Sequence, residues 1–469
     1  MFFRSFFDEK LAQYSYLVGC QRTGEAIVID PARYVEPYFL VAEKEGLHIV
    51  AAAETHIHAD FVSGARELAL RHDVKLYLSD EGDNDWKYEY VDDVQHEKVK
   101  DGTSFSIGNI GFEVLHTPGH TPESISFLLT DRGGGSEKPM GIFTGDFVFV
   151  GDVGRPDLLE KAANVAGSSK VGAEQMFESL KRFKNLPDFL QVWPGHGAGS
   201  ACGKSLGAVP MTTVGYEKMT NWALQHTDKE EFVKELTDEQ PEPPKYFAMM
   251  KKVNKEGPEL TNDEPVPEID TIETLEQTIN NSQSVLVDTR PAQEFGERHL
   301  PGSINIPFNK SFPNWAGWLV EYDQDIYVLC DQNQVQDVKI ALQSIGLDQL
   351  KGFAKVDILD EARNTESYEL IDVPELNQRL DEGSVYLIDV RNQSEWNQGH
   401  IRGANHMMLG KLKDRLDEIP SDKDIVLQCQ SGQRSAIATS LLQGNGFKNV
   451  INLKGGFGAW LNEGMPVEK

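Results

Sequence analysis

The sequence of 469 residues contains only four cysteines, Cys20, Cys202, Cys330 and Cys429, and they are widely separated. Four scattered thiols cannot form the dense disulfide framework of small secreted domains, so a reducing, cytoplasmic location is predicted. No continuous apolar run is long enough to cross a bilayer. The N-terminal MFFRSFFDEKLAQ also lacks the apolar core and cleavage site of a secretory signal, and a strand is expected there instead.

Positive charge is scarce as well. The 45 Lys and Arg residues face 74 Asp and Glu residues, which gives a formal net charge of -29 at pH 7. Binding to nucleic acids or anionic membranes depends on Lys and Arg that displace counterions, so neither partner is expected. The 39% of hydrophobic and 25% of charged residues are typical of globular material, and the length predicts about three domains.

Two passages in the second half repeat each other. They are VLVDTRPAQEFGERHLPGSIN at 285–305 and YLIDVRNQSEWNQGHIRGANH at 386–406, with matching Asp-x-Arg, Glu-aromatic and His-aliphatic pairs at one offset. Each is followed by a strand pattern that ends in a cysteine and by a helical pattern, which predicts a small parallel α/β unit. The copies are placed at 271–365 and 366–469, after a Pro-rich and charged linker at 251–270.

Residues 1–250 show many short strand patterns broken by Gly and Pro, which predicts a mixed α/β domain of two packed sheets flanked by helices. Four of these patterns end in metal-capable side chains: THIHAD at 55–60, HTPGHT at 116–121, FTGDF at 143–147 and VWPGHG at 192–197. Strand ends converge on one edge of a sheet, so distant ligands can meet there. A lone histidine is more often a surface or packing group, but four such segments together predict a metal site.

This combination resembles the metallo-β-lactamase superfamily, whose motif is Thr-His-x-His-x-Asp-His. The resemblance implies an αββα sandwich for residues 1–250. In the two-metal hydrolases of that superfamily, the glyoxalase II type, the final Asp-His pair helps to hold a second ion. Here the last position is Phe61, whose ring cannot coordinate a metal, so a mononuclear centre is expected.

One ion bound by His56, His120 and Asp146 would have two imidazoles and one carboxylate, the facial triad suited to non-haem Fe(II). This resembles the persulfide dioxygenases, the iron-dependent branch of the superfamily. The run GDVGRPDL at 151–158 is also similar to that branch, and its alternative is a surface turn with a salt-bridged arginine. The resemblance implies that a low-molecular-weight thiol persulfide is oxidised with O₂ to sulfite and free thiol.

The same interpretation gives roles to further residues. Arg155 would offset the charge of the substrate. His58, Asp60 and His196 would orient ligands or relay protons, with the alternative that His58 and His196 help to hold a second zinc.

The Gly-rich loop GHGAGSACGKSLG follows at 195–207. Cys202 on this loop is a candidate for contact with the substrate, although a packing role is equally open, and Lys204 is a candidate for steering an anion. Cys20 is expected to be structural.

The stretch VLQCQSGQRSA at 426–436 places Cys429 between a strand and a helix, where backbone N–H groups stabilise a thiolate. It resembles the rhodanese family of sulfurtransferases, whose catalytic cysteine opens a six-residue loop. That loop is CQSGQR here, with Arg434 closing it and Ser431 and Gly432 as substrate contacts. Phosphatases of related fold have one more residue before the arginine, so this loop favours sulfur over phosphate. The alternative is a buried structural cysteine.

The first copy carries the loop CDQNQV. Cys330 is kept, but Val335 stands in place of the arginine and Asp331 follows the thiol. A carboxylate beside the sulfur opposes thiolate formation, so this module is predicted to be inactive and to position the other two. The segment WAGWL at 315–319 is expected to contribute to a domain contact.

The domain order resembles bacterial fusion proteins that detoxify sulfide-derived persulfides. It implies that sulfite accepts sulfane sulfur from Cys429 to give thiosulfate, and that the chain forms a homo-oligomer. Two other functions remain open: a binuclear zinc thioester hydrolase of the glyoxalase II type with sulfurtransferase tails, and a sulfur-carrier or persulfide-sensing scaffold. No motif identifies the thiol that carries the persulfide.

Overall fold

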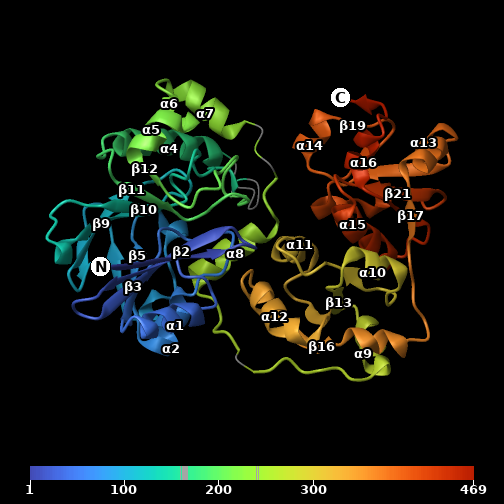
Figure 1. Ribbon diagram of the computed structural model, residues 1–469, viewed down its shortest axis with the longest axis horizontal. Helices are drawn as coiled ribbons and strands as arrows, with labels where there is room; N and C mark the ends of the chain where they lie inside the picture. The colour runs from blue at the N-terminus through green and yellow to red at the C-terminus, as the bar shows by residue number, and fades with distance from the viewer. Residues whose placement is uncertain (159, 161–166, 239, 241, 263) are drawn as a thin grey trace. The chain divides into compact units, whose positions relative to one another are not determined.

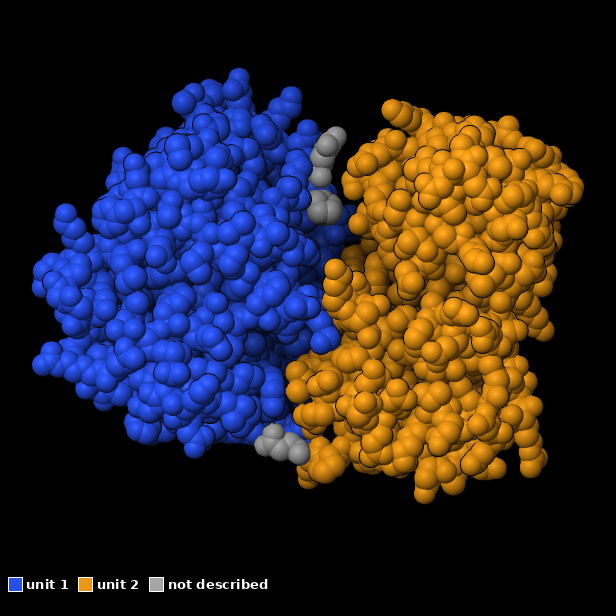
Figure 2. Space-filling model, in the orientation of Figure 1, with its two compact units in different colours: residues 1–262, 343–346 blue, residues 263–342, 347–469 orange. Residues whose placement is uncertain are grey.

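The computed structural model describes residues 1–158, 160, 167–238, 240, 242–262 and 264–469. The chain divides into two compact units, residues 1–262 with 343–346 and residues 263–342 with 347–469 (Figure 2). Among the helices of the described residues, none has the length and apolar character of a membrane span.

The first unit contains two six-stranded sheets (Figure 1). The first sheet has the order β1-β2-β3-β4-β5-β6, with β1 to β3 antiparallel and β3 to β6 parallel. Its strands are β1 Phe2–Asp8, β2 Gln13–Cys20, β3 Glu25–Ile29, β4 His48–Ala53, β5 Lys75–Ser79 and β6 His96–Val99. The second sheet has the order β12-β11-β10-β9-β8-β7. Its strands are β7 Ser104–Ile107, β8 Ile110–His116, β9 Ile125–Asp131, β10 Gly141–Gly145, β11 Gln191–Pro194 and β12 Thr212–Thr213.

The core of this unit lies between the two sheets. One apolar cluster joins Tyr16 and Ile27 of the first sheet to Phe127, Phe143 and Trp193 of the second. The short strand β7 illustrates the pattern, because alternate residues are buried and exposed along it, as expected for a strand with one face on a core.

Helices cover the outer faces of both sheets. α1 Glu36–Lys44 and α2 Ala65–His72 contact the first sheet. A second apolar cluster packs α4 Ser168–Lys184, α5 Val214–Thr220, α6 Trp222–Gln225 and α7 Lys229–Thr237 against the second sheet. The buried residues of α4 recur at helical spacing, which explains how it presents one apolar face. The αββα sandwich expected for this part of the chain is confirmed.

Helix α8 Tyr246–Glu256 overlaps the start of the stretch 251–270 that was predicted to be a linker. Its Tyr246, Phe247, Met250 and Asn254 are buried, and the Asn254 amide donates to the carbonyl oxygens of His58 and Phe61. The lysines between these positions hide the helical periodicity in the sequence. Residues 251–256 therefore support the loop after β4 instead of forming part of a connection.

The second unit contains two parallel sheets with the same core strand order. The first has the order β14-β13-β15-β16, and the second has β20-β18-β21-β22 with β17 added at its edge. The strands are β13 Ser284–Asp288, β14 Ile304–Asn305, β15 Asp325–Leu329, β16 Leu350–Ala354, β17 Glu369–Ile371, β18 Val385–Asp389, β20 Asn405–His406, β21 Asp424–Gln428 and β22 Val450–Leu453. A two-stranded sheet pairs β19 His400–Ile401 with β23 Val467–Glu468. The predicted pair of parallel α/β modules is confirmed.

Helices connect these strands. The first module has α9 Ile272–Ile279, α10 Ala292–Glu297, α11 Phe312–Leu319 and α12 Val335–Gln343, with the 3₁₀ segment η5 Val356–Asp360. The second has α13 Val373–Asp381, α14 Gln393–Gln398, α15 Gln433–Gly444 and α16 Gly456–Asn462.

The two modules contact each other through α15, whose residues 435–442 are all buried. The Ser440 hydroxyl accepts a hydrogen bond from the Asn305 N–H of β14 at 3.0 Å. Trp318, within the WAGWL segment, packs against Gly410, where a Cβ would lie 2.4 Å from the indole. The helix that follows the Cys429 loop is therefore enclosed partly by the first module.

Candidate functional site

Three buried side chains converge where strands of the first unit end. His56 lies in the loop after β4, His120 in the turn between β8 and β9, and Asp146 directly after β10. One ligand atom of each lies within 4.8 Å of the other two. Asp146 Oδ2 is 3.9 Å from His56 Nε2 and 3.5 Å from His120 Nε2.

Glycines at two positions allow this convergence. Gly145, at the end of β10, has a positive φ of +51°, and a Cβ there would lie 2.3 Å from Thr55 Oγ1. A Cβ on Gly154 would lie 1.8 Å from the Asp146 carbonyl oxygen. Any larger residue at either position would move Asp146 away from His56.

The atoms that face each other across this site lack protein partners. His56 Nε2 and Asp146 Oδ2 are buried and make no hydrogen bond among the described residues. The opposite ring nitrogens are occupied: His56 Nδ1 lies 3.0 Å from Thr55 Oγ1, and His120 Nδ1 donates to the Arg155 carbonyl oxygen at 2.9 Å. Histidines that bind metals are usually held in this way through the second nitrogen.

The donor set fits a divalent metal ion. Two ligands bonded to one ion at about 2.1 Å lie roughly 3 to 4 Å apart, which matches the spacing of these three side chains. Buried polar atoms without a partner are unfavourable, and a bound ion would satisfy them. Two imidazoles and one carboxylate suit iron or zinc better than magnesium or calcium.

The electrostatics favour the protonation states that a metal needs. Burial lowers the pKa of both His56 and His120, so the imidazoles are neutral. Burial opposes ionisation of Asp146, but His196, His56 and His120 outweigh it and hold the pKa of that carboxyl well below its usual range. The site therefore presents two neutral nitrogens and one carboxylate.

His58 lies beside His56 of the triad, with ring centroids 4.2 Å apart, and its Nδ1 is buried without a hydrogen-bond partner among the described residues. Its Nε2 lies 3.2 Å from Asp30 Oδ1, and Asp30 also accepts hydrogen bonds from the Thr55 N–H and hydroxyl. Burial opposes the charged imidazole, but Asp30 and the nearby acidic groups outweigh it and raise the pKa of His58 to about 9. The Phe61 ring packs on His58 with a centroid separation of 4.4 Å.

Asp60 and His196 adjoin the triad. His196 Nδ1 lies 2.7 Å from Asp146 Oδ1, and its Nε2 lies 2.6 Å from Asp60 Oδ2. Cys202 is also buried, and one ligand atom each of Asp60, His196 and Cys202 lies within 4.8 Å of the other two.

Arg155 and Lys204 both make hydrogen bonds to other groups of the first unit. The Arg155 guanidinium is buried and makes two hydrogen bonds of 2.7 Å to Asp157, so its charge is already balanced. Arg155 contributes its carbonyl oxygen to His120 instead. The exposed Lys204 side chain donates to the Asp238 carbonyl oxygen.

Sequence reasoning missed three groups in this region. Asp30 directly follows β3, so it carried the same signal of a polar residue after an apolar strand that identified the other segments. Glu123 is fully buried and accepts a hydrogen bond from the Ile57 N–H at 2.8 Å, which fixes the loop between His56 and His58. Asn254 could not have been found, because it reaches this loop from a distant helix.

The Cys429 loop connects β21 to α15 in the second unit. The thiol is 1% exposed, and its Sγ accepts hydrogen bonds from the Gly432 N–H at 3.2 Å and the Ser435 hydroxyl at 3.5 Å. Gly456 packs against the same loop, since a Cβ there would lie 2.2 Å from the Cys429 carbonyl oxygen. These donors would stabilise a sulfur anion on the cysteine.

Arg434 closes the loop with a partner that the sequence did not reveal. Its guanidinium makes hydrogen bonds of 2.6 and 2.7 Å to Glu395 of α14, and Glu395 also accepts from the Asn392 N–H. Ser431 is exposed and Gly432 half-buried on the loop between Cys429 and Arg434. The predicted sulfur-transfer residues therefore lie together on one loop, with the charge of Arg434 shared with a carboxylate.

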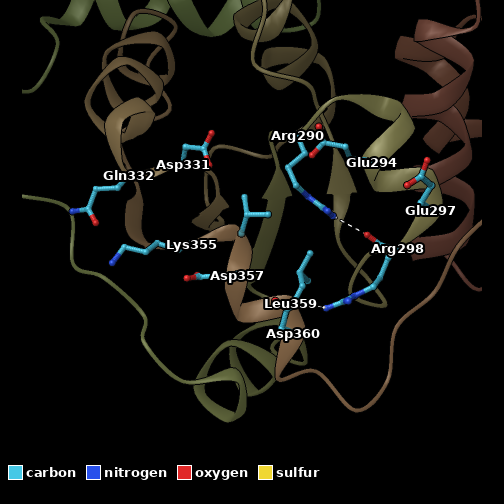
Figure 3. A pocket seen from close by; sticks show the side chains of 11 residues that line it. Arg290, Glu294, Glu297, Arg298, Asp331, Gln332, Lys355, Asp357, Leu359 and Asp360 are labelled. Carbon is cyan, nitrogen blue, oxygen red and sulfur yellow. Dashed lines mark hydrogen bonds and ion pairs between the residues drawn. The ribbon is translucent and has the colours of Figure 1, made fainter.

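The corresponding loop of the first module has different properties. Burial, Asp331 and Asp288 raise the pKa of the Cys330 thiol to about 12. A cavity of about 600 Å³ opens beside this loop, lined by residues that include Arg290, Glu294, Asp331, Lys355 and Asp357 (Figure 3). Lys355 and Arg290 are held by Glu268 and Asp288. The raised pKa therefore favours the protonated thiol of Cys330, and these two cations beside it are already paired with carboxylates.

Comparison with known proteins agrees with this architecture. Residues 9–196 match the Metallo-beta-lactamase superfamily, and residues 271–363 and 372–463 match the Rhodanese-like domain. A crystal structure of a metallo-beta-lactamase from Staphylococcus aureus subsp. aureus COL is 46% identical, with a TM-score of 0.69, over 76% of this chain and 99% of that chain.

Two characterised relatives match separate parts. The persulfide dioxygenase ETHE1 of Bos taurus is 27% identical over 198 residues, covering 41% of this chain and 67% of that protein. A sulfurtransferase of Allochromatium vinosum is 41% identical over 98 residues, covering 21% of this chain and 92% of that protein.

Proposed function

Because the chain belongs to the metallo-beta-lactamase superfamily and carries two rhodanese-like domains, we propose that it couples two reactions of sulfur. The first unit is a mononuclear non-haem Fe(II) dioxygenase that oxidises a low-molecular-weight thiol persulfide with O₂ to sulfite and the free thiol. The second unit is a sulfurtransferase in which Cys429 passes sulfane sulfur to sulfite, giving thiosulfate. Together they would remove sulfide-derived persulfides.

The observation that carries this proposal is the buried convergence of His56, His120 and Asp146 beside Phe61. A binuclear hydrolase needs a second set of ligands that includes a histidine at the Phe61 position. An apolar ring fills that position, and the neighbouring His58 is engaged by Asp30. These contacts support one catalytic ion, and a donor set of two imidazoles and one carboxylate suits Fe(II).

When bound, Fe(II) would supply the redox chemistry for the activation of O₂ and a coordination position for the terminal sulfur of the substrate. Residues of the chain orient the three ligands and exclude bulk water. The carbonyl oxygen of Arg155 and the Thr55 hydroxyl fix the two imidazole rings, while the 2.7 Å contact to His196 fixes the Asp146 carboxylate. Burial of all these groups keeps bulk water away from the reacting sulfur.

The overall balance of the first reaction is simple. The persulfide, O₂ and water give the free thiol, sulfite and protons, with two sulfite oxygens from O₂ and the third from water. Protons must leave the site, and His196 between Asp146 and Asp60 offers a path for them.

At Cys429 the transfer exchanges one S–S bond for another. Sulfite attacks the terminal sulfur of a Cys429 persulfide, the Cys429 S–S bond breaks, and thiosulfate forms as the thiolate is released. The Gly432 N–H and the Ser435 hydroxyl stabilise the sulfur anion at both stages. A cytoplasmic location remains a prediction. A homo-oligomer remains a prediction.

The test is anaerobic purification, iron quantification and measurement of O₂ uptake with glutathione persulfide. We expect one iron per triad and one O₂ consumed per persulfide, with both lost in His56→Ala. Cys429→Ser should keep the uptake but accumulate sulfite in place of thiosulfate, and an unchanged product ratio would remove the coupling. Hydrolysis of a glutathione thioester without O₂ uptake would instead support the zinc hydrolase, and neither reaction would support a sulfur-carrier or sensor scaffold.

A further inference from the structure

A hollow in the first rhodanese-like module consists of two cavities, of about 600 and about 580 Å³. Arg290, Glu294, Asp331 and Val356 line both cavities, so the two adjoin each other. The smaller cavity is also lined by Gln433, the first residue of α15, so the second module forms part of its wall. Cavities of this size commonly hold small molecules.

The positive charges at this hollow are already balanced. Each of the three cationic side chains that line it lies close to a carboxylate: Arg290 to Asp288 at 2.6 Å, Arg298 to Asp360 at 3.0 Å and Lys355 to Glu268 at 2.7 Å. An anionic ligand would have to displace one of these carboxylates. The hollow is therefore poorly suited to the anions that a sulfurtransferase binds.

Three further carboxylates at the hollow have no such partner. They belong to Glu294 of α10, Asp331 in the loop after β15 and Asp357 of η5, and all three residues are exposed. Their carboxylates make no hydrogen bond or ion pair within the part of the chain that the structure describes. Figure 3 shows the three residues at the cavity, on separate chain segments. Like charges gathered around one hollow favour the binding of a cation.

Comparison of the two modules explains why Glu294 is unpaired. Its counterpart in the second module, Glu395, makes hydrogen bonds of 2.6 and 2.7 Å with Arg434. In the first module Val335 stands in place of that arginine, so the carboxylate is kept and the cation is missing. Asp331 adds a second negative charge within the same loop. The loop of the first module therefore favours cations, whereas the loop of the second favours anions.

The smaller cavity combines a buried thiol with an apolar wall. Cys330 lines it, is 1% exposed, and its thiol makes no hydrogen bond among the described residues. A buried polar group without a partner gains one when a ligand lies beside it. Pro291, Pro307, Phe308 and Val356 also line this cavity. Such a wall suits an organic molecule better than a hydrated metal ion, which prefers a shell of oxygen ligands.

We propose that this hollow binds a small organic cation with primary ammonium groups, of the linear polyamine class. The ammonium groups pair with Glu294 and Asp331, which line both cavities, and the carbon chain packs against the apolar wall of the smaller one. The same carboxylates repel thiosulfate and other anionic sulfur compounds. The first module then has a binding role of its own, in addition to the positioning role predicted from its sequence.

The test is isothermal titration calorimetry of the full chain with spermidine at low ionic strength. We expect one spermidine bound per chain, with an affinity that falls as salt is added. Asp331→Asn and Glu294→Gln should each reduce the affinity by ~5-fold to 30-fold, because each removes one negative charge from the site. Val356→Trp, which fills space in both cavities, should abolish binding, and melting curves establish that each variant is folded.

A matched variant separates this site from general attraction to a chain with a net charge of -29. Asp337→Asn removes a carboxylate of α12 that lines neither cavity, and it should leave the affinity for spermidine unchanged. Binding of spermidine that Asp331→Asn and Glu294→Gln do not weaken overturns the proposal. Displacement of spermidine by an equal concentration of Mg²⁺ also overturns it, because the hollow would then be a metal site.

Spermidine binding does not depend on the proposed function, since it is measured without O₂, persulfide or thiosulfate. If only the cation site is wrong, the wild type consumes O₂ and transfers sulfur but does not bind spermidine. If only the proposed function is wrong, spermidine binds and the two carboxylate variants weaken its binding, while O₂ uptake and sulfur transfer are absent.

Discussion

The two rhodanese-like modules share a framework but differ at one loop. In both, an arginine makes paired hydrogen bonds to the aspartate two residues earlier, Arg290 to Asp288 and Arg391 to Asp389, with the shortest distance 2.6 Å in each case. The framework is thus retained in the module whose loop lacks the arginine. Residues that hold the fold and residues that act on sulfur are separable in this architecture.

The loops differ because their supporting segments differ. After β22, Gly456 adopts a positive φ of +59° and lies against the Cys429 carbonyl oxygen, while the Phe457 N–H donates to that oxygen at 2.7 Å. After β16, the same place is taken by Val356 and Asp357, which begin a 3₁₀ segment and line the cavity that also contacts Asp331. Figure 3 shows Asp357 and Asp331 at this cavity. Side chains there prevent the close backbone packing that shapes a tight anion-binding loop.

The sharpest test of this difference is removal of each thiol. Cys429→Ser should lower sulfurtransferase activity, assayed with thiosulfate and cyanide, by about 10³-fold or more, because no other group accepts the sulfur. Cys330→Ser should leave the activity unchanged, since its thiol stays protonated. A large loss with Cys330→Ser would show that the first module is active.

The second test disturbs the packing behind the loop. Gly456→Ala should reduce the same activity by ~100-fold, because a Cβ 2.2 Å from the Cys429 carbonyl oxygen must displace the loop, and the positive φ adds strain. The KM for thiosulfate should rise, and the melting temperature should fall slightly.

Asp357→Gly in the first module is the matched control. It should change neither the activity nor the Cys429 loop, because glycine alone does not restore an arginine where Val335 stands. If Gly456→Ala and Asp357→Gly reduced the sulfurtransferase activity equally, the loss in Gly456→Ala would come from lower stability and not from displacement of the Cys429 loop.

These differences show what the sequence could predict. Strand periodicity and the repeat located both modules, and the missing arginine distinguished the first module from the second, because these features are local. The partner of Arg434 could not be predicted, since Glu395 lies on another helix and reaches it only in the folded module. In the first unit, a salt-bridged Arg155 was the stated alternative, and its local pairing with Asp157 is present, although the resemblance had favoured a substrate role.

The third test changes the charge beside the Cys330 thiol. Burial and Asp331 raise the pKa of Cys330 to about 12, so the thiolate fraction is very small at pH 8. Asp331→Asn removes a negative charge that opposes ionisation, lowers this pKa and should speed alkylation of Cys330 about threefold to tenfold at pH 8. Site-resolved mass spectrometry after treatment with iodoacetamide measures the rate.

The raised pKa of Cys330 also predicts how the rate of its alkylation depends on pH. Alkylation of Cys330 should rise about tenfold per pH unit between pH 7 and 9 in the wild type, as expected below the pKa of a thiol. Asp337→Asn, a charge change on α12 outside the loop, is the control and should not alter the rate. A rate that levels off near pH 8 would contradict the raised pKa.

The smallest effect is expected from the carboxylate that pairs with Arg434. Glu395→Gln removes a negative charge beside the guanidinium, so the local potential becomes more positive and an anionic donor binds more tightly. The KM for thiosulfate should fall about twofold to fivefold, with kcat nearly unchanged, and the change should shrink at high salt because the interaction is electrostatic. Glu294 is at the matching position of the first module, where Val335 stands in place of the arginine. Glu294→Gln is therefore the control and should leave the KM for thiosulfate unchanged. A raised KM in Glu395→Gln would instead show that the carboxylate serves mainly to orient Arg434, and the loop would then depend on geometry more than on charge.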